Sequence, residues 1–234
     1  MDPGIAVVLE RRQTADGELV LRRAGGHLEL IMNGVFLMST SNGASERELV
    51  RAARPRGRLL IGGLGAGFSL AEAAAAPQVR DVVVVESEAD VIAWGDTYFR
   101  PYNEGALANP KVTVIHADLA DYLRGAAPGG FDGICLDTDN GPGWLSKPGN
   151  AALYSEAGLG RLRDLLAPGG RLAVWAAHES GEFAVRLGKV FGSVAGSVAG
   201  SVAGGVPGCV PGIVRVPVER GPDDVIYVAD RLMS

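Results

Sequence analysis

The stretch LLIGGLGAGFSLAEAAAAPQVRDVVVVES, from Leu59 to Ser87, constrains the fold more than any other part of this sequence. An apolar run leads into a cluster that contains Gly62, Gly63, Gly65 and Gly67, and an alanine-rich run and a second apolar run follow. Glycines between a strand and a helix permit a tight turn and a close approach of a ligand to the backbone. The stretch therefore predicts a strand, a ligand-binding loop, a helix and a second strand.

The alternation of apolar and helical segments continues to the end of the chain. Nearly continuous apolar strands are typical of parallel strands that are covered on both faces. The pattern predicts an α/β fold with a doubly wound, mostly parallel sheet. We expect strands at RLLIGG, DVVVVES, KVTVIHAD, FDGICLDTD and GRLAVWAAH, and helices at about 69–76, 89–99, 119–124 and 155–166.

The two ends of the chain show a different, alternating pattern that is typical of antiparallel strands. Residues 1–44 predict a small N-terminal β-hairpin unit with an Asn-Gly turn, which precedes an α/β domain over residues 45–234. The segment SERELVRAA predicts a short helix with Ser45 as its N-cap and Glu48 completing a capping box. Near the C-terminus, two alternating runs about GPDD predict an antiparallel hairpin at the sheet edge.

The segment GSVAGSVAGSVAGG, from 192 to 205, repeats a four-residue unit. A glycine at every fourth position makes it a poor helix former, although its valines would share one face of a helix. We expect a length expansion of a surface loop without a chemical role.

Composition excludes several classes of function. The formal net charge of −5 offers no basic surface for nucleic acid and suits small or cationic partners. Cys135 and Cys209 lack the spacing of a metal site or a disulfide framework, so we expect inert thiols and no metal. The first apolar run is too short for the core of a secretory leader, and no apolar run is long enough to span a membrane, so we expect a cytoplasmic protein.

The glycine loop departs from the dinucleotide-binding pattern. Counted from Gly63, Phe68 occupies the position of the third glycine in the G-x-G-x-x-G motif. This departure makes an NAD-linked oxidoreductase the weakest hypothesis. Glu86 ends the next strand, where an acid reaches ribose hydroxyls, and Asp118 ends the third strand, where an acid can contact an adenine amino group. A nucleoside without a pyrophosphate, such as S-adenosylmethionine, fits best. The alternative is that both acids are simply polar strand ends.

The chain resembles the spermidine synthase (polyamine aminopropyltransferase) family, which has a class I methyltransferase-like Rossmann fold and a small N-terminal β-domain. The resemblance implies S-adenosylmethionine or its decarboxylated form as the donor, a small amine as the acceptor, and assembly into homodimers or larger oligomers. The segments that carry it are LELIMNGVFLMST, IGGLGAG, VVES, YFRPYNEGALANPKVTVIHAD, FDGICLDTDNGP, LYSEAGLGRLRDLLAPGGRLAVWAAHES and DDVIYVADR.

Transferred residue by residue, the resemblance assigns Glu86 to the ribose, Asp118 to the adenine, and Asp137 to activation of the nucleophile. Asp137 follows a strand at the edge where open α/β sheets bind ligands, and a carboxylate there can take the proton of an amine nucleophile. Asp139 is a candidate electrostatic partner that would raise the pKa of this base. The alternative is that Asp137 and Asp139 only cap the DNGPG turn.

Three departures from the family pattern concern residues expected at the donor's amine and at the acceptor. Gly65 replaces the acid of the usual GGGDGG run that helps to hold the amine of the decarboxylated donor. The run 46–48 reads Glu-Arg-Glu instead of Tyr-His-Glu, and residues 137–142 read Asp-Thr-Asp-Asn-Gly-Pro in place of the Asp-Ser-Ser-Asp-Pro segment. The missing acid at Gly65 favours methyl transfer slightly over aminopropyl transfer, although the resemblance alone would favour aminopropyl transfer.

Aromatic and polar residues past two strand ends are candidates for the acceptor pocket. Asn140 and Trp144 follow one strand, and Trp175 and His178 end the next. A cation over an indole ring gains about 0.5 to 2 kcal/mol, so both tryptophans suit a cationic acceptor. Core packing is the alternative for Trp175, and an ordinary surface position is the alternative for His178.

Two main hypotheses therefore compete. The first is a transferase that moves an alkyl group from S-adenosylmethionine or its decarboxylated form to a small, amine-bearing acceptor, with Asp137 as the base. The second is a non-catalytic nucleoside-binding relative that acts as a sensor or a partner subunit, which the altered run at 46–48 motivates.

Overall fold

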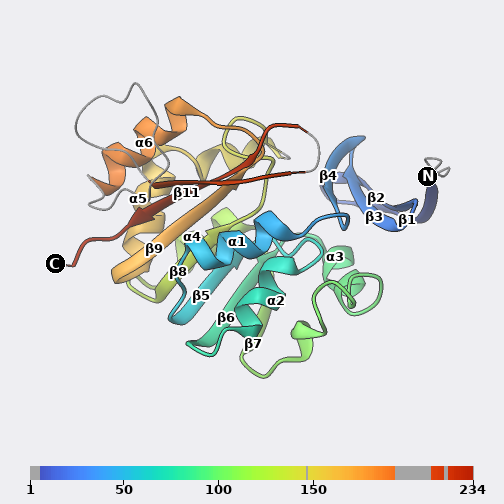
Figure 1. The fold of residues 1–234 in the computed structure, drawn as a ribbon, viewed down its shortest axis with the longest axis horizontal. Coiled ribbons are helices and arrows are strands. Elements are labelled where there is room, and N and C mark those ends of the chain that lie inside the picture. Colours follow the sequence, from blue (N-terminus) through green and yellow to red (C-terminus); the bar gives the residue numbers. More distant parts are fainter. Residues whose placement is uncertain (1–5, 146, 193–211, 219–220, 234) are drawn as a thin grey trace.

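The computed structural model contains two β-sheets, an N-terminal antiparallel sheet and a larger mixed sheet with helices on both faces (Figure 1). Cys209 and the predicted loop expansion after Gly192 lie outside the described residues. The structure describes residues 6–145, 147–192, 212–218 and 221–233.

The N-terminal sheet has four strands in the order β1-β2-β3-β4. Asn33 and Gly34 connect β3 to β4 with φ angles of 51° and 80°, as the Asn-Gly signal predicted. The first strand was not predicted, because its largely exposed side chains leave no clear alternation of apolar and polar residues. The strands are β1 (Val7–Thr14), β2 (Gly17–Ala24), β3 (His27–Met32) and β4 (Val35–Ser39).

The helix α1 (Ala44–Ala52) leads from this sheet into the larger domain. The prediction of Ser45 as its N-cap is wrong, because Gly43 occupies that position and the Asn42 side chain accepts a hydrogen bond from the Ala44 N–H. Ser45 is instead buried inside the helix, where its hydroxyl donates to Glu46 Oε2 at 3.0 Å. The first turn of α1 therefore carries polar groups that face the protein interior.

The larger sheet has seven strands in the order β10-β11-β9-β8-β5-β6-β7. Five of them, β5 to β9, are parallel, and β11 runs antiparallel to β9 and to β10. This order confirms the predicted doubly wound sheet and the C-terminal hairpin. The strands are β5 (Gly57–Gly62), β6 (Val79–Glu86), β7 (Val112–His116), β8 (Phe131–Leu136), β9 (Leu166–Ala176), β10 (Gly212–Val216) and β11 (Asp224–Asp230).

Helices cover both faces of the larger sheet and bury two apolar clusters (Figure 1). The first cluster takes side chains from α1, α2 and α3, and the second from α4, α5 and α6. Within the described ranges no helix is long and apolar enough to cross a membrane. The remaining helices are α2 (Phe68–Ala75), α3 (Ala89–Gly95), α4 (Leu119–Gly125), α5 (Glu156–Leu165) and α6 (Gly181–Phe191), with short 3-10 helices η1 (Ala106–Ala108) and η2 (Pro148–Ala152).

The apolar runs of the sequence explain why this sheet is buried on both sides. In β6, Val82 and Val84 pack into the first cluster, whereas Val83 and Val85 pack into the second. Successive strand residues point to opposite faces, so a continuous valine run serves both. The parallel strands consequently end at one common edge, and the loops after them lie close together.

Candidate active site

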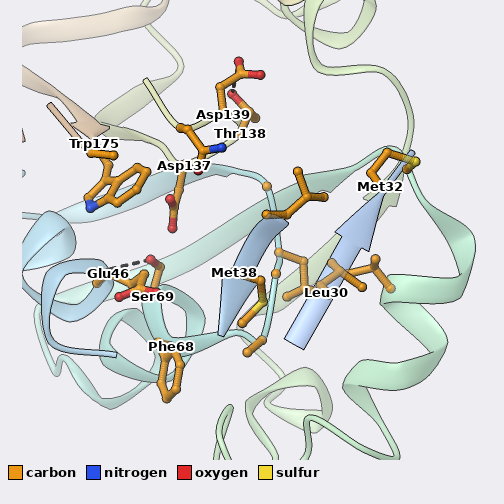
Figure 2. Close-up of a pocket in the computed structure, with 18 of the residues that line it drawn as sticks. Leu30, Met32, Met38, Glu46, Phe68, Ser69, Asp137, Thr138, Asp139 and Trp175 are labelled. Carbon is orange, nitrogen blue, oxygen red and sulfur yellow. Dashed lines mark hydrogen bonds between the residues drawn. The ribbon is translucent and has the colours of Figure 1, made fainter. Parts of the chain in front are cut away.

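A cavity of about 850 Å³ lies between the carboxyl ends of the parallel strands and the N-terminal sheet. Figure 2 shows Leu30, Met32 and Met38 of the N-terminal sheet on one side of it, and Asp137, Ser69 and Glu46 on the other. Eleven of the twelve predicted site residues line this one cavity: Gly63, Gly65, Gly67, Glu86, Asp118, Asp137, Asp139, Asn140, Trp144, Trp175 and His178.

Gly62 is the predicted residue that lies outside the cavity. It is buried at the end of β5, where a Cβ would lie 2.6 Å from the nearest methyl carbon of Leu119 in α4. Its role is therefore to let α4 pack closely against the sheet.

The glycine loop combines positive φ angles with close packing. Gly63, Gly65 and Gly67 have φ angles of 90°, 52° and 84°, which side chains rarely tolerate. A Cβ on Gly63 would lie 2.4 Å from the main-chain oxygen of Asp137, and a Cβ on Gly67 would lie 2.6 Å from Asn103 Cβ. The nearest atom to a Cβ on Gly65 is 3.6 Å away, so this glycine leaves an open stretch of cavity wall.

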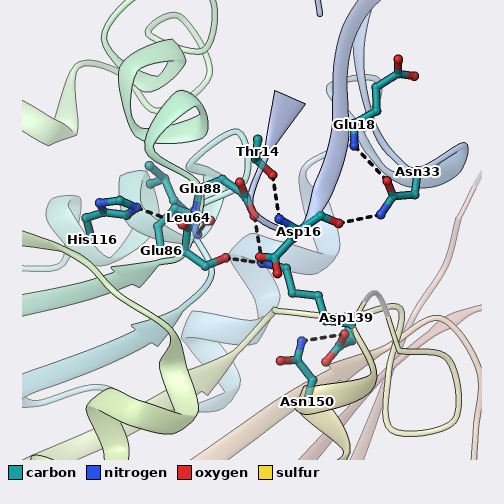
Figure 3. Close-up of polar contacts among 12 residues, drawn as sticks. Thr14, Asp16, Glu18, Asn33, Leu64, Glu86, Glu88, His116, Asp139 and Asn150 are labelled. Atoms are coloured by element: carbon teal, nitrogen blue, oxygen red, sulfur yellow. Dashed lines mark hydrogen bonds and ion pairs between the residues drawn. The ribbon is translucent and has the colours of Figure 1, made fainter. Parts of the chain in front are cut away.

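Glu86 holds the glycine loop from the end of β6 (Figure 3). Its Oε2 accepts from the Leu64 N–H at 2.9 Å, and its Oε1 accepts from the Glu88 N–H at 2.8 Å. Burial raises the pKa of Glu86, while these two backbone donors oppose the shift. Each carboxylate oxygen can accept a second hydrogen bond, so Glu86 can support the loop and also bind a ligand hydroxyl.

Asp118 lies at the end of the neighbouring strand, β7. It is the N-cap of α4, where its Oδ1 accepts from the Asp121 N–H at 3.0 Å. Because β6 and β7 are paired, Glu86 and Asp118 lie on adjacent strand ends at the same edge of the sheet. Their assignment to the ribose and the adenine of one nucleoside stays a prediction.

Asp137 directly follows β8, and its N–H donates to the Gly62 oxygen at 2.9 Å. Burial raises the pKa of Asp137 to about 8, and the charges of Glu46 and Asp224 add to the rise. The Ser69 hydroxyl acts in the opposite direction. A carboxylate with a pKa near neutrality is a much stronger base than an ordinary aspartate.

Glu46 and Asp224 were not predicted as site residues, yet both line the cavity. Burial is the main cause that raises the pKa of each of them, and the charge of Asp224 adds to the rise at Glu46. Asp224 begins β11, whose antiparallel course places its first residue at the carboxyl end of β9. The sequence signal for Asp224 was an acid directly before the buried strand VIYVA.

Asp139 is buried and held by two side chains that follow it in the sequence. Its Oδ2 accepts from the Tyr154 hydroxyl at 2.9 Å. Its Oδ1 accepts from Asn150 Nδ2 at 3.0 Å (Figure 3). Burial and the negative charge of Asp139 raise the pKa of Tyr154. Asp139 thus fixes the segment after β8 while it borders the cavity.

The predicted acceptor-side residues lie at the rim and the wall of the cavity. Trp144 is half exposed, and its ring stacks on His178 with centroids 6.3 Å apart and an interplanar angle of 16°. Trp175 packs against the first apolar cluster, and its Nε1 is buried without a hydrogen-bond partner among the described residues. Asn140 donates weakly, at 3.4 Å, to the main-chain oxygen of Phe36.

The sequence analysis did not predict Lys147 as a site residue. Its side chain links its own segment to the loop after β6 and to the β1–β2 turn, beside the cavity. Its Nζ donates to Ser87 Oγ at 2.8 Å and to Glu88 Oε1 at 2.9 Å, and it also pairs with Asp16 in the β1–β2 turn. The hydrogen bond from Lys147 lowers the pKa of Asp16. The N-terminal sheet is thereby joined to the loop after β6.

The cavity wall is strongly acidic. Of the described residues that line it, Lys147 is the only lysine or arginine, and two are histidines, His27 and His178. No group of three or more candidate ligands in the described part of the chain has the arrangement of a metal site. The carboxylates that line the cavity are the seven side chains of Glu46, Glu86, Glu88, Asp118, Asp137, Asp139 and Asp224.

The larger sheet, with a cavity at its strand ends, defines a Rossmann-like α/β protein. Two solved structures with the same fold are spermidine synthases. One, in complex with the transition-state analogue AdoDATO, has a TM-score of 0.75 and 16% identity over 97% of this chain and 75% of its own. The spermidine synthase from Thermotoga maritima has a TM-score of 0.72 and 16% identity, and the match covers 97% of this chain and 73% of that enzyme's chain.

The curated relatives confirm the resemblance to the polyamine aminopropyltransferases. The enzyme of that name from Mycobacterium tuberculosis (strain ATCC 25618 / H37Rv) is 33% identical over 175 residues, which cover 72% of this chain and 32% of the relative. Putrescine N-methyltransferase 3 from Nicotiana tabacum is 33% identical over 86 residues, which cover 37% of this chain and 22% of the relative. No family model matches the chain.

The chain is thus similar to polyamine aminopropyltransferases in sequence and has the spermidine synthase fold. It spans about a third of the length of the first curated relatives that it matches. The preference for methyl transfer that the sequence analysis drew from Gly65 finds no support in these comparisons.

Proposed function

We propose that this protein transfers an aminopropyl group from decarboxylated S-adenosylmethionine to a small amine. The observation that carries the proposal is the charge of the cavity, where seven carboxylates face a single lysine among the described lining residues. Such a wall favours ligands with positive charge and disfavours anions. The similarity to polyamine aminopropyltransferases supports the same reaction.

The charge of the cavity also bears on the choice of donor. Lys147 already pairs with Glu88 and Asp16, so it is engaged with two negative charges. The carboxylate of S-adenosylmethionine would enter the cavity without a strong counter-charge, and desolvating an unpaired charge is costly. The decarboxylated donor avoids this cost and retains an ammonium group that the acidic wall can accept.

The nucleoside half of the donor fits the strand ends next to the glycine loop. Glu86 has remaining acceptor capacity for ribose hydroxyls, and Asp118 offers an exposed carboxylate on the adjacent strand. The positive φ angles of the loop allow the backbone to approach the ligand closely. We therefore assign the donor to this half of the cavity and the acceptor to the side of Asp137.

Asp137 serves as the base in the proposed reaction. An amine arrives protonated, and Asp137 takes one proton from it, which frees the nitrogen lone pair. The nitrogen attacks the carbon next to the sulfonium, so that a nitrogen–carbon bond forms and the carbon–sulfur bond breaks. The bonding electron pair moves to sulfur and leaves methylthioadenosine as a neutral thioether. Alignment of the two reactants in one cavity supplies much of the acceleration.

A transfer assay with the purified protein tests this proposal. The protein is incubated with putrescine and either decarboxylated S-adenosylmethionine or S-adenosylmethionine, and the products are identified by mass spectrometry. We expect an aminopropylated amine and methylthioadenosine from the decarboxylated donor. A methylated amine from S-adenosylmethionine would replace the proposal by methyl transfer, and a lack of turnover with either donor would favour a non-catalytic relative.

A further inference from the structure

The polarity of the cavity changes between its interior and its opening to solvent. In the interior, Asp139 is buried, and burial raises the pKa of Asp137. At the opening, which we call the mouth, the exposed lining residues include four that carry rings: Phe36, Trp144, His178 and Pro222. A ligand that reaches from the interior to the mouth would therefore meet negative charge at one end and ring surfaces at the other.

The rings of the mouth come from four segments that the fold brings together at the strand ends. Asn140, after β8, donates from Nδ2 to the main-chain oxygen of Phe36 in β4 at 3.4 Å. The main-chain oxygen of Asn140 accepts from the Ala177 N–H at 3.0 Å, directly after β9. Pro222 precedes β11, whose first residues pair with the last residues of β9. The mouth is thus built on the same framework that positions Asp137.

Trp144 and His178 form the most extended ring surface of the mouth. Their rings stack with centroids 6.3 Å apart and an interplanar angle of 16°, although the two residues follow different strands. The Trp144 N–H donates to the Gly141 oxygen at 3.0 Å, and a Cβ on Gly141 would lie only 2.7 Å from Ala176 Cβ. The turn that carries the indole is therefore packed against β9, while the Trp144 side chain stays 50% exposed. A further aromatic ring can contact this surface in an offset or edge-on arrangement.

Acidic side chains next to this stack are engaged with partners of their own. Glu179, the neighbour of His178, pairs with Arg215 at 2.5 Å. Asp139, five residues before Trp144, accepts from the Tyr154 hydroxyl at 2.9 Å. The stack consequently favours a neutral aromatic group over a second cation at the mouth.

We propose that Trp144 and His178 are specificity-determining residues that bind an aromatic group of the acceptor at the mouth, while the amine of the acceptor reaches Asp137. This inference rests on the proposed function and makes primary amines with an aromatic group on the alkyl chain the preferred acceptor class. Removal of the ring from water and its contact with the indole both contribute to binding. An aliphatic amine of the same chain length lacks both contributions.

The test compares 4-phenylbutylamine with butylamine, which lacks the ring. Dissociation constants are measured by calorimetry with methylthioadenosine bound, and kcat/KM is measured with decarboxylated S-adenosylmethionine. The variants are Trp144→Ala, Trp144→Phe and His178→Ala. Val185→Ala is the matched control, because Val185 is an exposed apolar residue of α6 that does not line the cavity. Melting curves show whether each variant is folded.

We expect the wild type to bind 4-phenylbutylamine at least about tenfold more tightly than butylamine, with the same preference in kcat/KM. Trp144→Ala should lose most of this preference, Trp144→Phe should keep part of it, and His178→Ala should lose about threefold because the indole loses its stacking partner. Val185→Ala should behave as the wild type.

Equal affinity of the wild type for both amines, or an unchanged preference in Trp144→Ala, would overturn the inference, and transfer to butylamine or putrescine would still support the proposed function. Absence of transfer to all three amines would instead overturn the proposed function. The dissociation constants would in that case still decide whether the mouth binds the ring.

Discussion

The main-chain oxygen of Asp137 lies where a side chain on Gly63 would begin, since a Cβ there would be only 2.4 Å from it. The two segments are also joined by the hydrogen bond from the Asp137 N–H to the Gly62 oxygen, at 2.9 Å. The glycine loop therefore sets the position of the proposed base as well as the shape of the donor site. A change in this loop should affect both.

Two alanine substitutions in the loop distinguish the steric clash of a new Cβ from the cost of a positive φ angle in a residue with a side chain. Gly63→Ala and Gly65→Ala both place a side chain at positive φ, which costs about 1 to 2 kcal/mol. Only Gly63→Ala also meets backbone, so we expect it to lose about 1 to 3 kcal/mol more. Urea unfolding of both variants measures the difference. Equal losses would show that the contact with Asp137 does not limit the loop.

Asp137→Asn should reduce aminopropyl transfer by about two to four orders of magnitude, because the amide cannot take a proton from the amine. Binding of methylthioadenosine should stay within about twofold, since Glu86 and the glycine loop are unchanged. Asp121→Asn, at an exposed acid of α4, is the control and should retain full activity. An active Asp137→Asn variant would remove this residue from the role of base.

The raised pKa of Asp137 also predicts how stability depends on pH. The folded state keeps the proton up to about pH 8, whereas the unfolded chain loses it near the ordinary aspartate pKa of 3.8. The folded state therefore binds more protons over this range, and the free energy of unfolding falls as pH rises. Relative to the wild type, Asp137→Asn should gain more stability at pH 8.5 than at pH 5. Urea titrations at the two pH values give this difference, and a constant or opposite difference would contradict the assignment.

The ionisation of Asp137 should also determine how kcat/KM depends on pH. kcat/KM for the amine should rise as Asp137 loses its proton before the amine binds, with a midpoint near pH 8. A pH profile from 5.5 to 9, measured with saturating donor, tests this. A flat profile, or a profile that falls with pH, would mean that another group limits the reaction.

Lys147 should contribute more to stability than an ordinary surface lysine. Lys147→Ala leaves the buried Glu88 without its counter-charge, and we expect a loss of about 2 kcal/mol. Lys189→Ala is the control, because Lys189 and its partner Glu156 are both well exposed and their pair is worth about 0.5 kcal/mol or less. Thermal melts of both variants compare them directly. Equal, small effects would show that the tie between Asp16, Lys147 and Glu88 is weak in solution.

Much of the fold could be predicted from the sequence because its signals are local. Apolar runs such as Val82–Val85 indicate buried strands, and the Asn33-Gly34 pair indicates a hairpin turn. The first strand, with mostly exposed side chains, has no such signal, and α6 was also not predicted. Ser45 was misassigned because a capping pattern does not show whether the serine lies before the helix or inside it.

The site could be predicted where it follows a strand end. Glu86, Asp118 and Asp137 each come directly after an apolar run, and parallel strand ends meet at one edge. Glu46, Lys147 and Asp224 belong to other segments, whose approach depends on how α1, the segment after β8 and β11 pack. No local pattern records this packing, so these side chains emerged only from the structure.

A competition experiment tests the central claim most directly. The purified protein receives equal concentrations of S-adenosylmethionine and its decarboxylated form together with putrescine, and the mass of the modified amine is determined. The account predicts that an aminopropyl group is added and that methylthioadenosine accumulates. A methylated amine as the main product would contradict it.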